Sequence, residues 1–326
     1  MIEVKHLTKR YGDHTAVSDL SFTIEKGQIY GFLGPNGAGK STTMNIMTGC
    51  LAASSGQVTI GGYDIFEDAA KAKRMIGYLP EQPPLYPDRT PREYLTFVAR
   101  AKKVPESKIK EQTERVMALT QITEVADRLI KNLSKGYKQR VGIAQAILGD
   151  PEIIILDEPT VGLDPKQIIE IRELIQELGK NHTVILSSHI LSEVQSVCQT
   201  ILIISKGRLI ACDTPENLER LFAGTTTVEM TVEAEENEIH QILGTVERIS
   251  RLRVSTVSKD RCTVQAESDS EDADALCREI FFAFSAANRP ILQMSVARAS
   301  LEDIFIELTN DQKEKEEEKN ESCFPA

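Results

Sequence analysis

Tryptophan is absent from this 326-residue chain, and its six cysteines include no CxxC pair. A zinc site or a disulfide framework is therefore not expected, and scattered thiols suit a reducing cytosol. The N-terminus MIEVKHLTKRYG lacks the apolar segment of a signal peptide. No apolar run approaches the roughly 20 residues that a membrane-spanning helix needs. Any role at a membrane is expected to come through a partner subunit.

Positive charge is also scarce, because 38 lysines and arginines face 49 acidic residues and give a net charge of -11. Nucleic-acid binding relies on clustered basic side chains, so no nucleic-acid partner is expected. Apolar residues make up 41% of the chain and charged residues 27%. This composition is typical of a soluble globular protein, and the length favours two domains.

Strand and helix patterns alternate over residues 1–222. QIYGFL runs into a glycine-rich stretch, a helix pattern begins at Lys40, and the apolar run EIIIL at 152–156 is typical of a buried parallel strand. Residues 81–91 read as a proline-rich loop, and most of 92–149 reads as helix. The alternation predicts an α/β domain.

The pattern changes after residue 223. Residues 225–308 predict a smaller α+β domain with the order β-α-β-β-α-β, which is ferredoxin-like, and a last helix at SLEDIFIELT. The charge-dense tail at 311–326 is expected to be disordered.

The stretch GPNGAGKS fits the phosphate-loop pattern G-x-x-x-x-G-K-[ST] between a strand and a helix. Its glycines let backbone N–H groups approach phosphate oxygens, and the helix N-terminus adds a positive dipole end. Lys40 is expected to reach the β- and γ-phosphates, and Ser41 to ligate Mg²⁺. An ordinary glycine-rich turn is the plainer reading, which the strand-to-helix context disfavours. The expected nucleotide contacts in the loop are Gly34, Pro35, Asn36, Gly37, Ala38, Gly39, Lys40, Ser41 and Thr42.

Two acidic residues end the apolar strand in IIILDEP. Asp157 is expected to hold Mg²⁺, and Glu158 to act as general base on the attacking water. In an extended strand, the Glu158 side chain is expected to point away from that of Asp157. The plainer alternative is a pair of acids that cap a helix before Pro159.

The segment LSKGYKQR at 133–140 resembles the signature of the ATP-binding cassette family, the ATPase subunits of ABC transporters. That signature is usually LSGGQ. Leu133, Ser134 and Gly136 match it, whereas Lys135 and Tyr137 depart from it. Four further residues resemble family landmarks in the family's order: Tyr11 of the A-loop, Gln82 of the Q-loop, Asp164 of the D-loop and the switch histidine His189.

The resemblance implies a P-loop NTPase domain with a mixed sheet core and a helical subdomain, which binds ATP and Mg²⁺. Tyr11 would stack on adenine, Gln82 would ligate Mg²⁺ or hold water, and His189 would contact the γ-phosphate. Ser134 and Gly136 would bind the ATP held by a second chain. Each of these residues also has a plainer reading, such as a strand tyrosine, a solvated loop glutamine, or a helix cap for Ser134, Asp164 and His189.

The family further implies a homodimer or a pair with a related ATPase subunit, a membrane permease as partner, and a peripheral place on the cytoplasmic face of the membrane. The ending ASLEDIFIELT resembles ABC-2 type exporter ATPases of the gliding-motility and multidrug-export kind. Leu85 and Tyr86, in the proline-rich loop 83–91, are candidate permease contacts.

Two other functions stay open at this point. One is a non-transport ABC ATPase that acts on ribosomes or DNA or as a regulatory or mechanochemical module. The other is a binding module that has lost hydrolysis. A single cassette and an acidic chain argue against ribosome or DNA work, and intact Lys40, Asp157, Glu158 and His189 argue against lost hydrolysis.

Overall fold

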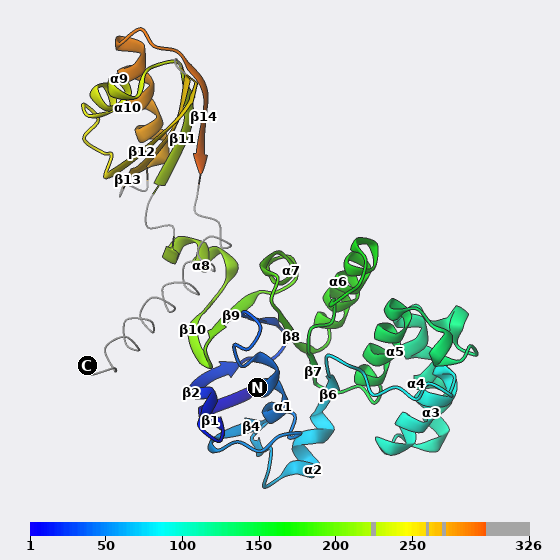
Figure 1. Ribbon diagram of the computed structural model, residues 1–326. Coiled ribbons are helices and arrows are strands. Elements are labelled where there is room, and N and C mark those ends of the chain that lie inside the picture. The colour runs from blue at the N-terminus through cyan, green and yellow to red at the C-terminus, as the bar shows by residue number, and fades with distance from the viewer. Residues whose placement is uncertain (223–225, 259–260, 269–271, 298–326) are drawn as a thin grey trace, which may run out of the picture. The chain divides into compact units, whose positions relative to one another are not determined.

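The computed structural model describes residues 1–222, 226–258, 261–268 and 272–297. The chain divides into two compact units, Met1–Pro215 and Glu216–Ala326 (Figure 1). The expected helix at SLEDIFIELT and the charged tail at 311–326 lie outside the described residues. The domain limits expected at residues 222 and 225 stay a prediction.

A six-stranded sheet forms the centre of the first unit and confirms the α/β fold expected from the sequence. Its strands run parallel except for the last hairpin, in which β10 pairs antiparallel with β9. The order is β10 (Arg208–Asp213), β9 (Thr200–Ser205), β3 (Ile29–Leu33), β8 (Thr183–Ser188), β7 (Ile153–Leu156) and β6 (Ile76–Leu79).

The register of this sheet brings four strand ends to one edge. Leu33 of β3 pairs with Ser188 of β8, and Leu156 of β7 pairs with Leu186 of β8 and Leu79 of β6. The segments that follow β3, β6, β7 and β8 therefore start side by side. In open α/β sheets, ligands bind in the crevice outside these carboxyl ends.

A second, antiparallel sheet lies beside the first and has the order β2 (His14–Ile24), β1 (Ile2–Tyr11), β4 (Ser55–Ile60) and β5 (Tyr63–Asp64). Helix α1 (Lys40–Met47) packs between the two sheets. Its buried Met44, Ile46 and Met47 share one apolar core with side chains of both sheets. This core fixes the start of α1, and with it the glycine-rich loop that precedes the helix.

Three helices form a group next to β6 and β7 (Figure 1). They are α3 (Pro91–Ala101), α4 (Glu106–Leu119) and α5 (Lys135–Ile147). Thr90 caps α3 through a reciprocal capping box with Glu93, and Pro91 fills the first turn. Arg140 of α5 ties this group to the core through an ion pair of 2.5 Å with Glu170 of α6 (Pro165–Gly179).

Three further helices are short. They are α2 (Ala69–Ala72), α7 (Leu191–Gln195) and α8 (Pro215–Phe222). Helix α7 has only five residues. It ends where Ser196 and Val197 turn the chain back toward β9.

The second unit holds a four-stranded antiparallel sheet with the order β12 (Arg251–Ser258), β13 (Arg261–Ser268), β11 (Thr226–Val232) and β14 (Ile291–Ala297). Helices α9 (Glu236–Leu243) and α10 (Ala273–Ala286) bury Ile239, Ile280 and Phe284 against one face of this sheet. The chain order β-α-β-β-α-β agrees with the sequence pattern.

No helix among the described residues is long and apolar enough to cross a membrane.

Candidate active site

The glycine-rich loop between β3 and α1 is built for close approach of its backbone. Gly37 and Gly39 have φ angles of 81° and 102°, which side-chain-bearing residues rarely adopt. A Cβ on Gly39 would also lie 2.6 Å from the backbone oxygen of Ala16. Helix α1 begins without a side-chain cap, so its first N–H groups are available to an anion.

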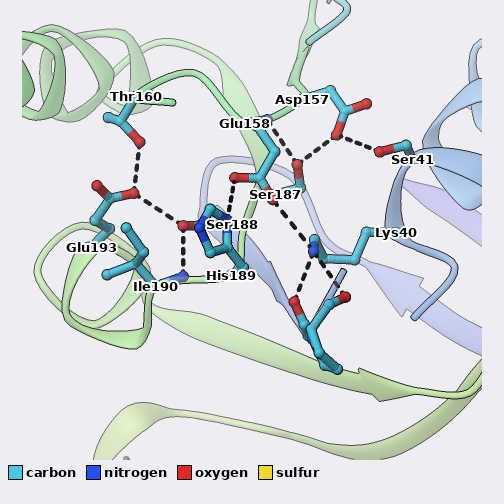
Figure 2. Close-up of polar contacts among 12 residues, drawn as sticks. Lys40, Ser41, Asp157, Glu158, Thr160, Ser187, Ser188, His189, Ile190 and Glu193 are labelled. Atoms are coloured by element: carbon cyan, nitrogen blue, oxygen red, sulfur yellow. Dashed lines mark hydrogen bonds and ion pairs between the residues drawn. The ribbon is translucent and has the colours of Figure 1, made fainter. Parts of the chain in front are cut away.

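Lys40 places a buried ammonium at this loop. Its side chain is 6% exposed, and Nζ donates hydrogen bonds to the backbone oxygens of Gly34 at 2.7 Å and Pro35 at 3.3 Å. The same Nζ forms an ion pair of 3.3 Å with Oε1 of Glu158 (Figure 2). The lysine is therefore held between the phosphate loop and the acidic segment that follows β7.

Asp157 lies at the end of β7 and accepts two hydroxyl hydrogen bonds on one oxygen. Ser41 Oγ donates to Oδ1 at 3.1 Å, and Ser187 Oγ donates to the same atom at 2.6 Å. Burial raises the pKa of the Asp157 carboxyl above its usual range. A carboxylate next to a hydroxyl is the kind of oxygen pair that Mg²⁺ prefers.

The expectation that Glu158 continues the extended strand is wrong. Strand β7 ends at Leu156, and Glu158 has a left-handed φ of 49°. This turn brings its carboxylate to two partners, because Oε2 lies 3.0 Å from Nδ1 of His189 while Oε1 faces Lys40. The Glu158 backbone N–H donates to Ser187 Oγ at 2.8 Å, which holds the turn in place.

These groups surround a cavity of about 490 Å³. Residues 35–42 form one wall, and Glu158 and His189 form another. Tyr11 stands at its rim with 49% of its surface exposed, and the Lys9 ammonium lies 5.1 Å from the centre of its ring. The structure thus places the phosphate loop, Glu158, His189 and Tyr11 around one cavity.

Three of the sequence candidates lie elsewhere in the single chain. Gln82 is exposed and lines a neighbouring cavity of about 380 Å³, which shares Glu81 with the phosphate-loop cavity. Ser134 and Gly136 line a third cavity of about 500 Å³, beside Asp164. One copy of the chain therefore does not bring Ser134 and Gly136 to its phosphate loop.

Ser134 and Asp164 both cap helices, which is the alternative interpretation that the sequence left open for them. Ser134 Oγ accepts from the Tyr137 N–H at 3.4 Å at the start of α5, and Asp164 accepts from the Gln167 N–H at 2.9 Å at the start of α6. The unusual Lys135 reaches Gly162 of its own chain, because a Cβ on that glycine would lie 2.0 Å from Lys135 Nζ.

Sequence reasoning missed a set of hydroxyl and carboxylate groups behind the cavity. Ser187 holds both Asp157 and Glu158, and Glu193 accepts hydrogen bonds from Thr160 and Ser188. The available signals were two consecutive serines before His189 and an acidic residue four positions after it. Serines at the end of a strand and an acidic residue on a short helix do not by themselves indicate an active site.

Comparison with known proteins agrees with this geometry. The model of the family described as ABC transporter matches residues 17–161. The linearmycin resistance ATP-binding protein LnrL of Bacillus subtilis (strain 168) is 33% identical over 310 residues, which cover 95% of this chain and 98% of LnrL. The bacitracin transport ATP-binding protein BcrA of Bacillus licheniformis is 40% identical over 212 residues, which cover 64% of this chain and 68% of BcrA.

Among solved structures, the dimeric post-hydrolysis state of the ATP-binding cassette MJ0796 bound to ADP and Pi is similar with a TM-score of 0.61. It is 25% identical, and the match covers 66% of this chain and 98% of that chain. The similarity thus extends over nearly all of the cassette.

Proposed function

This chain belongs to the ABC transporter family as the ATP-binding and ATP-hydrolysing subunit of an exporter, and we propose that it hydrolyses ATP in the cavity at the phosphate loop. The observation that carries this proposal is that Glu158 meets both Lys40 and His189 at that cavity. A carboxylate beside a phosphate-binding lysine is placed to act on water near a terminal phosphate.

Each residue of the cavity then has a role. The backbone N–H groups of residues 36–42 and the Lys40 ammonium bind the β- and γ-phosphates. Glu158 takes the proton of the attacking water, and His189 holds the γ-phosphate while its ring is oriented by Glu158. Tyr11 offers its exposed ring to adenine, with a stacking energy of roughly 1–3 kcal/mol.

Mg²⁺ would be held by Ser41 and Asp157. The fit rests on the 3.1 Å contact between the Ser41 hydroxyl and the Asp157 carboxylate, two oxygen donors beside the phosphate loop. The ion would neutralise phosphate charge when bound. Gln82 as a third ligand stays a prediction, because Gln82 lines the neighbouring cavity and its neighbour Glu81 lines this one.

The working unit is a dimer, either of two copies or of one copy with a related subunit. Cassettes of this family dimerise, and MJ0796 does so. In this chain, Ser134 and Gly136 line a different cavity from the phosphate loop, and this arrangement supports a dimer. In a head-to-tail pair, the start of α5 in one subunit would face the ATP of the other, and its N–H groups would bind the γ-phosphate.

The permease partner would hold the chain at the cytoplasmic face of the membrane. An exposed aromatic patch on the helical group supports this proposal. Tyr86 and Phe97 are each 50% exposed and their ring centres lie 5.5 Å apart, and the ring of Tyr86 also packs against the buried Tyr94. Such a patch suits a partner helix. The proposed cargo is an antibiotic, because LnrL and BcrA are named for linearmycin resistance and bacitracin transport.

The second unit would be a ferredoxin-like accessory domain. Its sheet order β12-β13-β11-β14 and its two helices on one face support this proposal. Dimerisation or regulation is the role we assign to it. The proposed limits are 1–222 for the ATPase domain and 225–308 for this domain.

Glu158→Gln tests the proposed chemistry, because glutamine keeps the size and removes the base. We expect retained ATP binding, loss of at least about 100-fold in kcat, and an ATP-dependent dimer in light scattering. Glu177→Gln, an exposed change on α6, is the matched control and should behave as the parent. Parent-like turnover in Glu158→Gln would refute the proposal. Export itself is tested by coexpression with candidate permeases and antibiotic survival assays.

A further inference from the structure

The carboxylate of Glu193 is a buried group behind the proposed site. Glu193 lies on α7, is 5% exposed, and forms no ion pair with any residue that the structure describes. Its Oε2 accepts hydrogen bonds from Thr160 Oγ1 at 2.6 Å and from Ser188 Oγ at 3.0 Å (Figure 2). Burial of a carboxylate is expensive unless strong hydrogen bonds compensate it.

The two hydroxyl donors belong to the two segments that carry the site. Thr160 follows Glu158 by two residues, and Ser188 directly precedes His189. Ser188 Oγ also accepts from the Ile190 N–H at 3.0 Å, on the other side of His189. Glu193 therefore joins the turn after β7 to the end of β8 (Figure 2), and it is not among the residues that line the phosphate-loop cavity.

Both of these turns need an outside restraint. Glu158 holds a left-handed backbone, and His189 lies beyond the end of β8 on a half-exposed segment. The contact between them, 3.0 Å from Nδ1 to Oε2, depends on the relative place of the two turns. A displacement of about 1 Å at such a contact is sufficient to reduce turnover roughly 100-fold.

We propose that Glu193 is a positioning residue for ATP hydrolysis, which sets His189 against Glu158 by binding Thr160 and Ser188 together. This inference rests on the proposed function of the cavity. The phosphate loop makes no hydrogen bond to Glu193 among those of the described residues, so ATP binding is expected to be independent of it.

The first test is kinetic. Glu193→Ala should lower kcat about 10- to 100-fold and change the KM for ATP by no more than about twofold. Glu193→Gln should lose less, because its amide oxygen still accepts one hydroxyl. Thr160→Val and Ser188→Ala should each give intermediate losses. Ser196→Ala, which removes a 2.9 Å bond to the Glu193 backbone oxygen only, is the control for α7 itself.

A double-mutant cycle separates positioning from general stability. In a His189→Ala background, measured by single turnover with labelled ATP, Glu193→Ala should cause little further loss. If Glu193 only stabilises the folded state, Glu193→Ala lowers the hydrolysis rate by the same factor in both backgrounds, and the melting temperature falls. Equal losses would overturn the inference.

Nuclear magnetic resonance of the histidine rings does not depend on catalysis, so it also serves where the residual activity of the variants is too low to compare. The ring resonances of His189 in labelled protein should shift in Glu193→Ala, whereas those of His182, which bonds to the Pro151 backbone oxygen, should not. An unmoved His189 resonance would also overturn the inference.

If Glu158→Gln retains hydrolysis, the proposed function fails. If hydrolysis needs Glu158 and His189 but not Glu193, only this inference fails.

Discussion

His189 Nδ1 lies 3.0 Å from Oε2 of Glu158, although 31 residues separate them in the chain. The contact exists because β7 and β8 are neighbours in register and end at the same edge of the sheet. It leaves the other carboxylate oxygen of Glu158 to Lys40. Lys40, Glu158 and His189 are therefore linked in one chain of polar contacts at the phosphate loop.

Lys40→Met should weaken ATP binding about 10- to 100-fold, because one charge-assisted hydrogen bond is worth roughly 1.5–3 kcal/mol. The methionine keeps most of the side-chain volume but cannot bond to phosphate. Titration calorimetry with ATP and Mg²⁺ measures the change. Lys26→Met, which removes a surface ion pair with Glu152, is the control. Parent-like affinity in Lys40→Met would contradict the assigned role.

Gly39→Ala and Gly37→Ala should differ in severity. Both residues have a positive φ, which costs alanine about 1 kcal/mol. Only at Gly39 would the added Cβ meet backbone, at 2.6 Å from the Ala16 oxygen, while nothing lies within 4 Å of it at Gly37. We expect Gly39→Ala to lose nucleotide binding and several degrees of thermal stability, and Gly37→Ala to lose less of both. Thermal melts with and without ATP compare them, and an equal effect would show that the Ala16 contact is unimportant.

Ser187→Ala should reduce kcat about tenfold or more. The serine donates to Asp157 and accepts from the Glu158 N–H, so alanine leaves that buried N–H unpaired and the carboxylate less well held. Steady-state hydrolysis at several Mg²⁺ concentrations measures the loss. Ser192→Ala, at an exposed position on α7, should leave the rate unchanged. A parent-like rate in Ser187→Ala would mean that backbone geometry alone holds the acidic turn.

Lys102→Met should destabilise the helical group by about 1–3 kcal/mol. The Lys102 ammonium donates to the backbone oxygens of Gln145, Ala146 and Leu148, at 2.8, 3.0 and 2.8 Å, and so satisfies carbonyls at the end of α5. Denaturant unfolding gives the difference. The neighbour Lys103, whose side chain has no polar partner among the described residues, supplies the control Lys103→Met. Equal stability of the two variants would exclude the capping role.

The α/β fold of the first unit was predictable because two local signals agree in it. A short apolar run such as 153–156 marks a buried strand, and the glycine-rich loop marks where a strand meets a helix. The chemistry of a phosphate loop is local too, since its residues are consecutive. This is why residues 34–42 were identifiable as a unit.

The rest of the site depends on contacts between distant segments, which local patterns do not contain. The left-handed turn at Glu158 is held by Ser187, 29 residues away, and strand alternation therefore gave the wrong geometry. Glu193 is polar on a helix of five residues, too short for periodicity to show that it is buried. Gln82 follows β6 and lines a cavity with Pro83 and Pro87 of the proline-rich loop, a placement that local patterns do not contain.

The left-handed backbone at position 158 also bears on how this protein can change. Glycine and asparagine adopt that conformation more readily than glutamate does, by about 1 kcal/mol. Either replacement would also leave the buried Lys40 ammonium without its ion-pair partner, which costs roughly 3–5 kcal/mol and exceeds the backbone gain. A laboratory selection for heat tolerance alone would therefore keep glutamate at this position. Robustness and work thus favour the same amino acid, and the strained backbone persists because its side chain compensates it.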